Sequence, residues 1–309
     1  MQIRRLLLTG LLLAALPAFG HTLGETASET AAGALSFEPA VVLPLLLLTI
    51  AYISGICHLH QQRIRQRVVS WEQCAAFALG MLALVAALMS PLDVLAESLF
   101  SAHMTQHLML MLVAPPLLIL GRIEIVLLWT FSLPVRRLIG RSWRKATWLR
   151  SALNLLMRPV AVWLLASATM WFWHIPGPYA WAFYNPGIHI LEHLSFFLTS
   201  LAFWALVMQP FRRDKRGHGT ALVLLATFAL ESTILGALLA FAVYPLYTEH
   251  AISTSRHVPH FLTGISPLQD QQLAGLIMWV PASLIQLVAL GAVFVDWLSA
   301  SKNPRTMAI

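Results

Sequence analysis

The long apolar stretches of this chain constrain its fold more than any other feature of the sequence. At about 1.5 Å per helical residue, about 20 apolar residues cross a hydrocarbon core about 30 Å thick. Because a lipid-exposed segment must satisfy its own backbone hydrogen bonds, such stretches are helices. We therefore predict an all-α fold, a polytopic transmembrane helix bundle with seven spans after signal-peptide removal. The expected spans are 39–59, 72–91, 104–121, 159–177, 190–210, 219–245 and 273–298.

Composition excludes a soluble enzyme. Hydrophobic residues make up 58% of the 309 residues and charged residues only 11%, about half the charged fraction of soluble domains. The net charge is +7, but the basic residues lie between apolar runs, so we expect membrane lipid and no nucleic acid as a partner. The two cysteines, Cys57 and Cys74, cannot form a disulfide framework or a four-cysteine zinc site, and we expect both to pack.

The ends of the chain differ from the bundle. Arg4 and Arg5 precede a short apolar run that ends at Pro17 and small residues, a pattern typical of a secretory signal peptide, with an uncleaved anchor as the alternative. The expected segments are a signal peptide at 1–20, a periplasmic N-terminal strap at 21–38, a seven-helix transmembrane domain at 39–300 and a cytoplasmic tail at 301–309.

The basic residues predict the orientation of the spans. With the mature N-terminus outside, 17 Lys and Arg residues fall in cytoplasmic segments and only Arg256 falls in an outer one. This asymmetry follows the positive-inside rule and predicts a cytoplasmic C-terminus. The basic stretch 134–150 is expected to lie along the anionic inner leaflet, as a solvated connector or a partner-binding segment.

Two shorter features refine the span prediction. Pro115 and Pro116 lie within the third span and remove two backbone donors, so we expect a kink or a split of the helix there. The apolar stretch 123–133 is too short to form an eighth span.

Histidine is frequent, at 12 residues, and the predicted topology places nine of them at or beyond the outer ends of spans. Two spans begin there with the pattern H-x-x-[QE]-H, at 103–107 and at 189–193. Because positions i and i+4 lie on one face of a helix, each pair can direct two imidazoles at one ion. The predicted metal ligands are His103, His107, His189 and His193.

The surrounding residues suggest which metal would bind. Imidazole suits copper, zinc, iron and nickel, whereas the thioethers of Met104, Met109 and Met111 would favour Cu(I). Gln106 and Glu192 each precede the second histidine of a pair, and we expect them to fix the imidazole tautomers from a second shell.

Other residues near the outer ends are further candidates. His174 follows two tryptophans at the end of the fourth span and is either a ligand or a residue of the aromatic belt. Asp270 precedes the seventh span and is a candidate to complete the site. Glu231 falls inside the sixth span, where an ionisable group is costly and therefore a functional candidate. Gln286 is expected to hydrogen-bond between helices.

Two further chemistries compete with a copper site. The 189–193 segment matches the H-x-x-E-H signature of inverted zinc peptidases, in which Glu192 would be the general base. However, its counterpart at 103–107 has glutamine at that position, and no third carboxylate ligand is obvious. Haem held by one histidine from each of two helices is the other alternative, and it would be non-covalent because the chain has no C-x-x-C-H motif.

Several separated motifs carry a family resemblance. They are HMTQH at 103–107, APPLL at 114–118 with Gly121, Trp173-His174 with Pro176 and Tyr179, His189, Glu192-His193-Leu194, Phe203-Trp204, Asp270-Gln271-Gln272, Gly275, Met278-Trp279 and Pro281. In this order they resemble the multi-span bacterial cytochrome c oxidase assembly proteins known as CtaG, which differ from the single-span copper chaperone of the same name. The resemblance covers about 90–285.

The resemblance implies a bacterial inner-membrane factor, not an enzyme, that helps to build a haem-copper oxidase. It implies copper as the cofactor, the oxidase catalytic subunit as the partner, and no small-molecule substrate. The residues that it points to are His103, His107, His189 and His193, with Glu192 and Asp270 as polar companions. A haem-binding electron carrier and a metal-free assembly scaffold remain alternatives.

Overall fold

A computed structural model describes residues 38–208, 215–249 and 264–302 of the chain. The described residues form an all-α bundle and contain no strand, so the predicted fold class is confirmed. The predicted signal peptide, nearly all of the N-terminal strap, most of the C-terminal tail and His250, His257 and His260 lie outside the described residues.

Six helical units are long and apolar enough to cross a membrane, and they coincide with six of the seven predicted spans. They are α2 (Pro39–Gln61), α4 (Trp71–Leu88), the unit Phe100–Leu120, α13 (Pro186–Met208), α14 (Lys215–Ala240) and α16 (Pro267–Lys302). Length and composition thus define a polytopic membrane protein.

The fourth predicted span differs from the prediction. Helix α11 (Pro159–Trp173) has only 15 residues, which reach about 22 Å at 1.5 Å per residue. It attains span length only together with α10 (Thr147–Leu156), from which it is bent by 68°. Pro159, at the start of α11, lacks the N–H that a helix continuing from α10 would need, which accounts for the break.

The third span is interrupted where the two prolines predict it. Helix α6 (Phe100–Leu108) passes into a π-helical turn (Met109–Val113) and then into α7 (Ala114–Leu120). Because Pro115 has no N–H, the carbonyl of Met111 loses its usual helical donor. The indole Nε1 of Trp204 on α13 donates to this carbonyl at 2.9 Å, so a neighbouring helix supplies the missing hydrogen bond.

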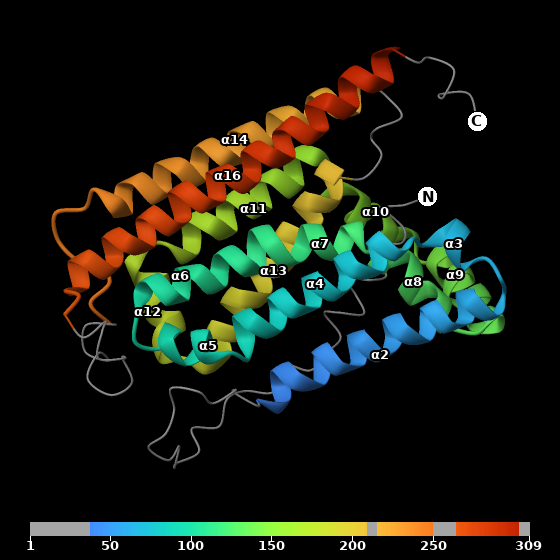
Figure 1. Ribbon diagram of the computed structural model, residues 1–309, viewed down its shortest axis with the longest axis horizontal. Coiled ribbons are helices and arrows are strands. Elements are labelled where there is room, and N and C mark those ends of the chain that lie inside the picture. The colour runs from blue at the N-terminus through green and yellow to red at the C-terminus, as the bar shows by residue number, and fades with distance from the viewer. Residues whose placement is uncertain (1–37, 209–214, 250–263, 303–309) are drawn as a thin grey trace.

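The helices run side by side along the long axis of the molecule (Figure 1). Helices α14 and α16 form an antiparallel pair along one side, and α2 lies on the opposite side. Short helices α5 (Pro91–Ala96) and α12 (Pro176–Tyr184) lie at one end of the bundle, where α6 and α13 begin. The other end holds α3 (Arg65–Val68), α8 (Ile123–Thr130) and α9 (Leu133–Lys145).

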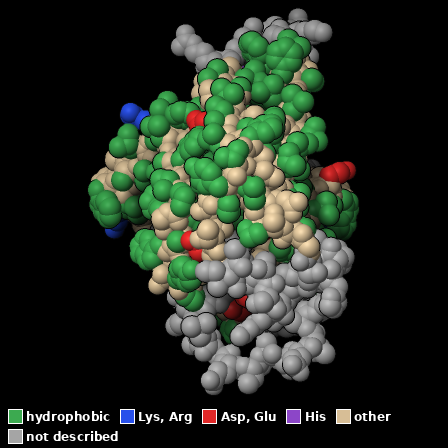
Figure 2. Space-filling view, turned by 90° about the vertical axis from the view of Figure 1, so that its left-hand side faces the viewer, with side chains coloured by type: hydrophobic (Ala, Val, Ile, Leu, Met, Phe, Trp, Pro, Cys, Tyr) green, Lys and Arg blue, Asp and Glu red, His purple; other side chains and the backbone are tan. Residues whose placement is uncertain are grey.

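The two ends match the two sets of segments that the charge pattern separates. The described basic segments around 63–67 and 122–158 gather at the α3–α9 end, and both histidine patterns lie toward the α5–α12 end (Figure 1). Among its described residues the latter end presents hydrophobic side chains together with backbone and uncharged polar side chains, and few charged ones (Figure 2). Large apolar side chains such as Ile50 on α2 and Val288 on α16 also point outward, as expected for lipid-facing helices.

Helices α14 and α16 approach each other closely at two glycines. A Cβ atom placed on Gly275 would lie 2.7 Å from the carbonyl oxygen of Gly236 and closer still to the backbone nitrogen of Ala240. Small residues at such contacts allow helix backbones to pack tightly within a membrane. The contact explains why a glycine is needed at position 275.

We expect Gly275→Ala to lower the stability of the protein by about 1 to 3 kcal/mol, because the added methyl group meets backbone atoms that cannot move independently. The matched control is Gly291→Ala on the same helix, where an added Cβ meets nothing within 4 Å. That control is expected to be neutral or stabilising by up to about 1 kcal/mol. Thermal unfolding in detergent measures both, and equal melting temperatures for the two variants would contradict the prediction.

Candidate metal centre

Two helices bring the predicted histidines to one place. His103 and His107 lie on α6, and His189 and His193 lie on α13 with Glu192 between them. All five residues occupy the first two or three turns of their helices, at most about 11 Å along the axis from the first residue. The two H-x-x-[QE]-H segments therefore face each other at the same depth of the bundle, as the sequence predicts.

Four of these residues form a tight cluster of potential ligands. One ligand atom from each of His103, His107, Glu192 and His193 lies within 4.8 Å of the others. The Glu192 carboxylate lies 3.9 Å from Nε2 of His103 and 3.8 Å from Nε2 of His107. These distances are too long for hydrogen bonds. Two ligands that each lie about 2.0–2.2 Å from one ion are at most about 4.4 Å apart, so the separations suit a shared ion.

His189 lies at the edge of this cluster and is less buried than His103 and His107. Its ring centroid is 4.2 Å from that of His193 and 5.4 Å from that of His103. The structure thus brings all four predicted imidazoles together, with three of them and Glu192 in the tight cluster and the fourth beside it.

Burial makes the polar atoms of the cluster chemically significant. Glu192 is 1% exposed and His107 is 3% exposed. Within the part of the chain that the structure describes, both carboxylate oxygens of Glu192 and both ring nitrogens of His107 lack a hydrogen bond. Burial without hydrogen bonds costs several kcal/mol for a carboxylate. A cation bound between these groups would offset that penalty.

His174 joins the cluster from a third helix. It follows the last residue of α11, and its ring centroid lies 6.4 Å from that of His107. Its Nδ1 lies 2.6 Å from the carbonyl oxygen of Met170, which can only accept, so Nδ1 carries the proton. This contact leaves Nε2 with a free lone pair, the arrangement that metal-ligating histidines use. His174 is buried, so it does not lie in an aromatic belt.

Asp270 contributes to the site indirectly. Its two carboxylate oxygens accept hydrogen bonds from the backbone N–H groups of Phe100, at 2.6 Å, and Ser101, at 3.1 Å. Asp270 belongs to α16, so it caps the N-terminus of α6 from a neighbouring helix and complements the positive end of that helix. It holds the start of the helix that carries His103 and lies outside the tight ligand cluster.

Gln106 does not have the second-shell position expected from the sequence. Its amide nitrogen donates to the carbonyl oxygen of Ala87 and to Asp93, both at 2.8 Å. Each residue turns the chain by about 100° around a helix, which directs Gln106 toward α4 and α5 while His107 faces α13. Gln106 therefore links α6 to α4 and α5 by hydrogen bonds. It does not take the place on α6 that Glu192 has among the clustered ligands on α13.

Two tyrosines that the metal prediction did not include cover the cluster. The ring of Tyr179 on α12 lies 5.6 Å from that of His103, and the hydroxyl of Tyr247 donates to the carbonyl oxygen of His174 at 2.6 Å. Burial raises the pKa of Tyr247 well above its usual value, so this hydroxyl stays protonated and remains a donor at neutral pH. Only the family motif pointed to Tyr179, and nothing in the sequence pointed to Tyr247.

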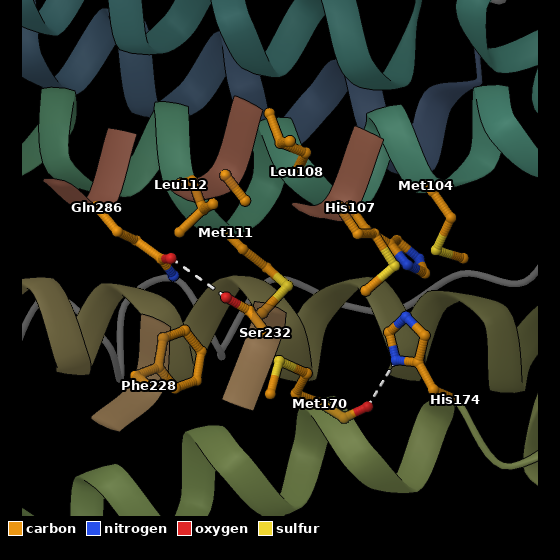
Figure 3. Close-up of a pocket in the computed structure, with 12 residues that line it drawn as sticks. Met104, His107, Leu108, Met111, Leu112, Met170, His174, Phe228, Ser232 and Gln286 are labelled. Atoms are coloured by element: carbon orange, nitrogen blue, oxygen red, sulfur yellow. Dashed lines mark hydrogen bonds between the residues drawn. The ribbon is translucent and has the colours of Figure 1, made fainter. Parts of the chain in front are cut away.

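A cavity adjoins the histidine cluster, and its lining residues come from α6, the π-helical turn, α11, α14 and α16 (Figure 3). Its lining includes His107 and His174 together with Met104 and Met111, two of the three methionines singled out in the sequence. The third, Met109, is only partly buried and does not line the cavity.

The remaining candidates lie apart from the cluster. Gln286 accepts a hydrogen bond from Ser232 at 3.2 Å, which confirms the expected link between helices α14 and α16. Glu231 is half-buried on α14 and is not among the clustered ligands. Cys57 is exposed and Cys74 is half-buried, so Cys57 does not pack as predicted and faces outward from α2.

The fold and the site define a class of protein: a multi-span helical membrane protein with a buried cluster of histidines and one carboxylate. The chain belongs to the family of cytochrome c oxidase caa3 assembly factors, Caa3_CtaG, whose model matches residues 50–300. This result confirms the resemblance stated from the sequence motifs. No curated protein and no solved structure matches the chain.

Proposed function

We propose that this assembly factor binds copper as cargo at His103, His107, Glu192 and His193 and passes it to the catalytic subunit of a haem-copper oxidase. The observation that carries the proposal is the convergence of three imidazoles and a carboxylate within 4.8 Å in a buried site. Imidazole nitrogen is a good ligand for copper, and haem-copper oxidases need copper for assembly. The protein turns over no substrate in this role.

The charge of the cluster favours Cu(I) over divalent ions. The cluster holds one carboxylate, Glu192, among neutral imidazoles. A monovalent cation with one carboxylate leaves no net charge, whereas a divalent ion leaves an uncompensated positive charge, which is costly to bury. In the predicted orientation the cluster lies toward the periplasmic side of the bacterial inner membrane, where an oxidase subunit can approach it.

The test compares the wild-type protein with a variant in which His103, His107, His189 and His193 are all replaced by Ala. We expect the copper content of the purified variant to fall at least about tenfold, and oxidase activity to be lost from membranes that contain only the variant. The control replaces His58 and His60, which lie at the opposite end of the bundle on α2. Equal copper content in all three proteins would overturn the proposal.

The same experiment separates the two alternatives. A haem-binding electron carrier would show a Soret absorption band after purification, whereas bound Cu(I) gives none. A metal-free scaffold would support normal oxidase activity with the four-histidine variant, while deletion of the whole protein would abolish that activity. Either result replaces the copper proposal.

A further inference from the structure

The cavity beside the histidine cluster has an unusual lining. Four methionines from four elements of the bundle border it: Met104 on α6, Met111 in the π-helical turn, Met170 on α11 and Met278 on α16. Methionine commonly fills gaps in hydrophobic cores because its side chain is flexible. Here the four methionines instead line a space that stays open, so gap filling does not explain their presence.

The methionines lie in helical register with the histidines of the metal centre. Met104, His107 and Met111 follow one another at three and four residues along the third span, and Met170 precedes His174 by four. Such spacing places sulfur and imidazole groups on the same face of a helix. The π-helical turn that carries Met111 is a feature often found at functional sites.

Two imidazoles belong to both the cavity and the histidine cluster. His107 and His174 line one end of the cavity, and Phe228 and Gln286 lie at the other end (Figure 3). His107 is also one of the four clustered ligands, and the Nδ1 proton of His174 is held by Met170. In Figure 3 the labelled side chains of Met111 and Met170 lie between these two ends, and Met104 lies beside His107 at the histidine end.

We propose that this cavity is a second metal compartment, selective for a soft monovalent cation, Cu(I), and connected to the histidine cluster through His107 and His174. The proposal rests on the proposed function, because the ion would enter by way of the cluster. Thioether sulfur is a soft, neutral ligand that selects Cu(I) over zinc and other divalent ions.

Transfer between the two compartments needs no electron or proton. A bond from copper to an imidazole nitrogen of the cluster breaks as a bond to a thioether sulfur forms, and the oxidation state stays Cu(I). Because Met104 and Met111 flank His107 on the same helical face, the exchange requires side-chain rotation only. The rest of the lining is largely apolar, including Leu108 and Leu112, which disfavours the entry of hydrated divalent ions.

The experiment titrates purified full-length protein with Ag(I), a redox-inert probe for Cu(I), and measures Cu(I) coordination by X-ray absorption. The cavity variant replaces Met111, Met170 and Met278 by Leu, which conserves volume and removes sulfur. The control replaces three methionines that do not line the cavity, Met81, Met89 and Met109, by Leu. A third variant, His189→Ala with His193→Ala, removes cluster imidazoles and leaves the cavity lining intact.

We expect the cavity variant to bind one Ag(I) equivalent fewer than wild type and to lose most of the sulfur signal, because only Met104 of the four lining methionines remains, while the control retains both. The cavity proposal would be overturned if the cavity variant bound as much Ag(I) as wild type and copper in the wild-type protein had only nitrogen and oxygen ligands. The proposed histidine site would be unaffected by that result. If the cavity variant loses metal binding and the His189/His193 variant binds as much metal as wild type, the cavity proposal is supported and the proposed histidine site is overturned. If wild type binds neither ion, both proposals fail.

Discussion

Replacing Glu192 by Gln is expected to weaken copper binding by roughly 100-fold or more. The carboxylate is 1% exposed and supplies the negative charge of the ligand cluster, and removing one partner of a buried ion pair costs about 3 to 5 kcal/mol. Glutamine has nearly the same shape, so packing around the site is retained. Competition with a Cu(I)-chelating dye measures the change in affinity.

The matched control for this variant is Glu124→Gln. Glu124 is also a buried glutamate, but it lies on α8 at the opposite end of the bundle (Figure 1). We expect its copper affinity to equal that of wild type. If Glu192→Gln bound copper as tightly as wild type while folding normally, the carboxylate would have no part in the site, and the preference for a monovalent ion would lose its basis.

Replacing Asp270 by Ala is expected to destabilise the protein by about 2 to 6 kcal/mol. The substitution leaves the N–H groups of Phe100 and Ser101 without their acceptor, and each buried donor without a partner costs about 1 to 3 kcal/mol. Because these groups begin α6, the first turn of that helix is expected to fray and to displace His103. Both the melting temperature and the copper affinity should therefore fall.

Asp270→Asn serves as the graded comparison for this prediction. The single carbonyl oxygen of the asparagine can accept from only one of the two N–H groups. We therefore expect the stability of Asp270→Asn to lie between that of wild type and that of Asp270→Ala. A copper affinity that fell in both variants without any change in melting temperature would instead indicate direct ligation by Asp270.

The sequence predicted those features that depend on a single helix. Apolar length placed six of the spans, and Pro115 and Pro116 predicted the break in the third. The spacing of four residues predicted that His103 and His107 share one face, as they do. Each of these follows from local geometry, which requires no knowledge of how the helices are arranged.

The features that the sequence missed depend on contacts between helices. The capping role of Asp270 joins residues 170 positions apart, and the methionine-lined cavity combines side chains from α6, α11 and α16. The direction of Gln106 toward α4 and α5 and the hydrogen bond from Tyr247 to His174 likewise depend on which helices are neighbours. Helix order in a bundle is not encoded in apolar periodicity, so these could not be derived.

The hydrogen bond from Trp204 to the carbonyl of Met111 has a consequence for how the proposed copper cargo would leave the protein. This hydrogen bond joins α13 to the third span at positions that follow the histidines along both helices. If α13 and the third span slid or moved apart, the buried carbonyl of Met111 would be left without a donor, because Pro115 has no N–H to offer within the helix. Release of the proposed copper ion is therefore expected to proceed by rotation of side chains while the two helices keep their positions. Helix α12 and Tyr247 would have to move to open a path.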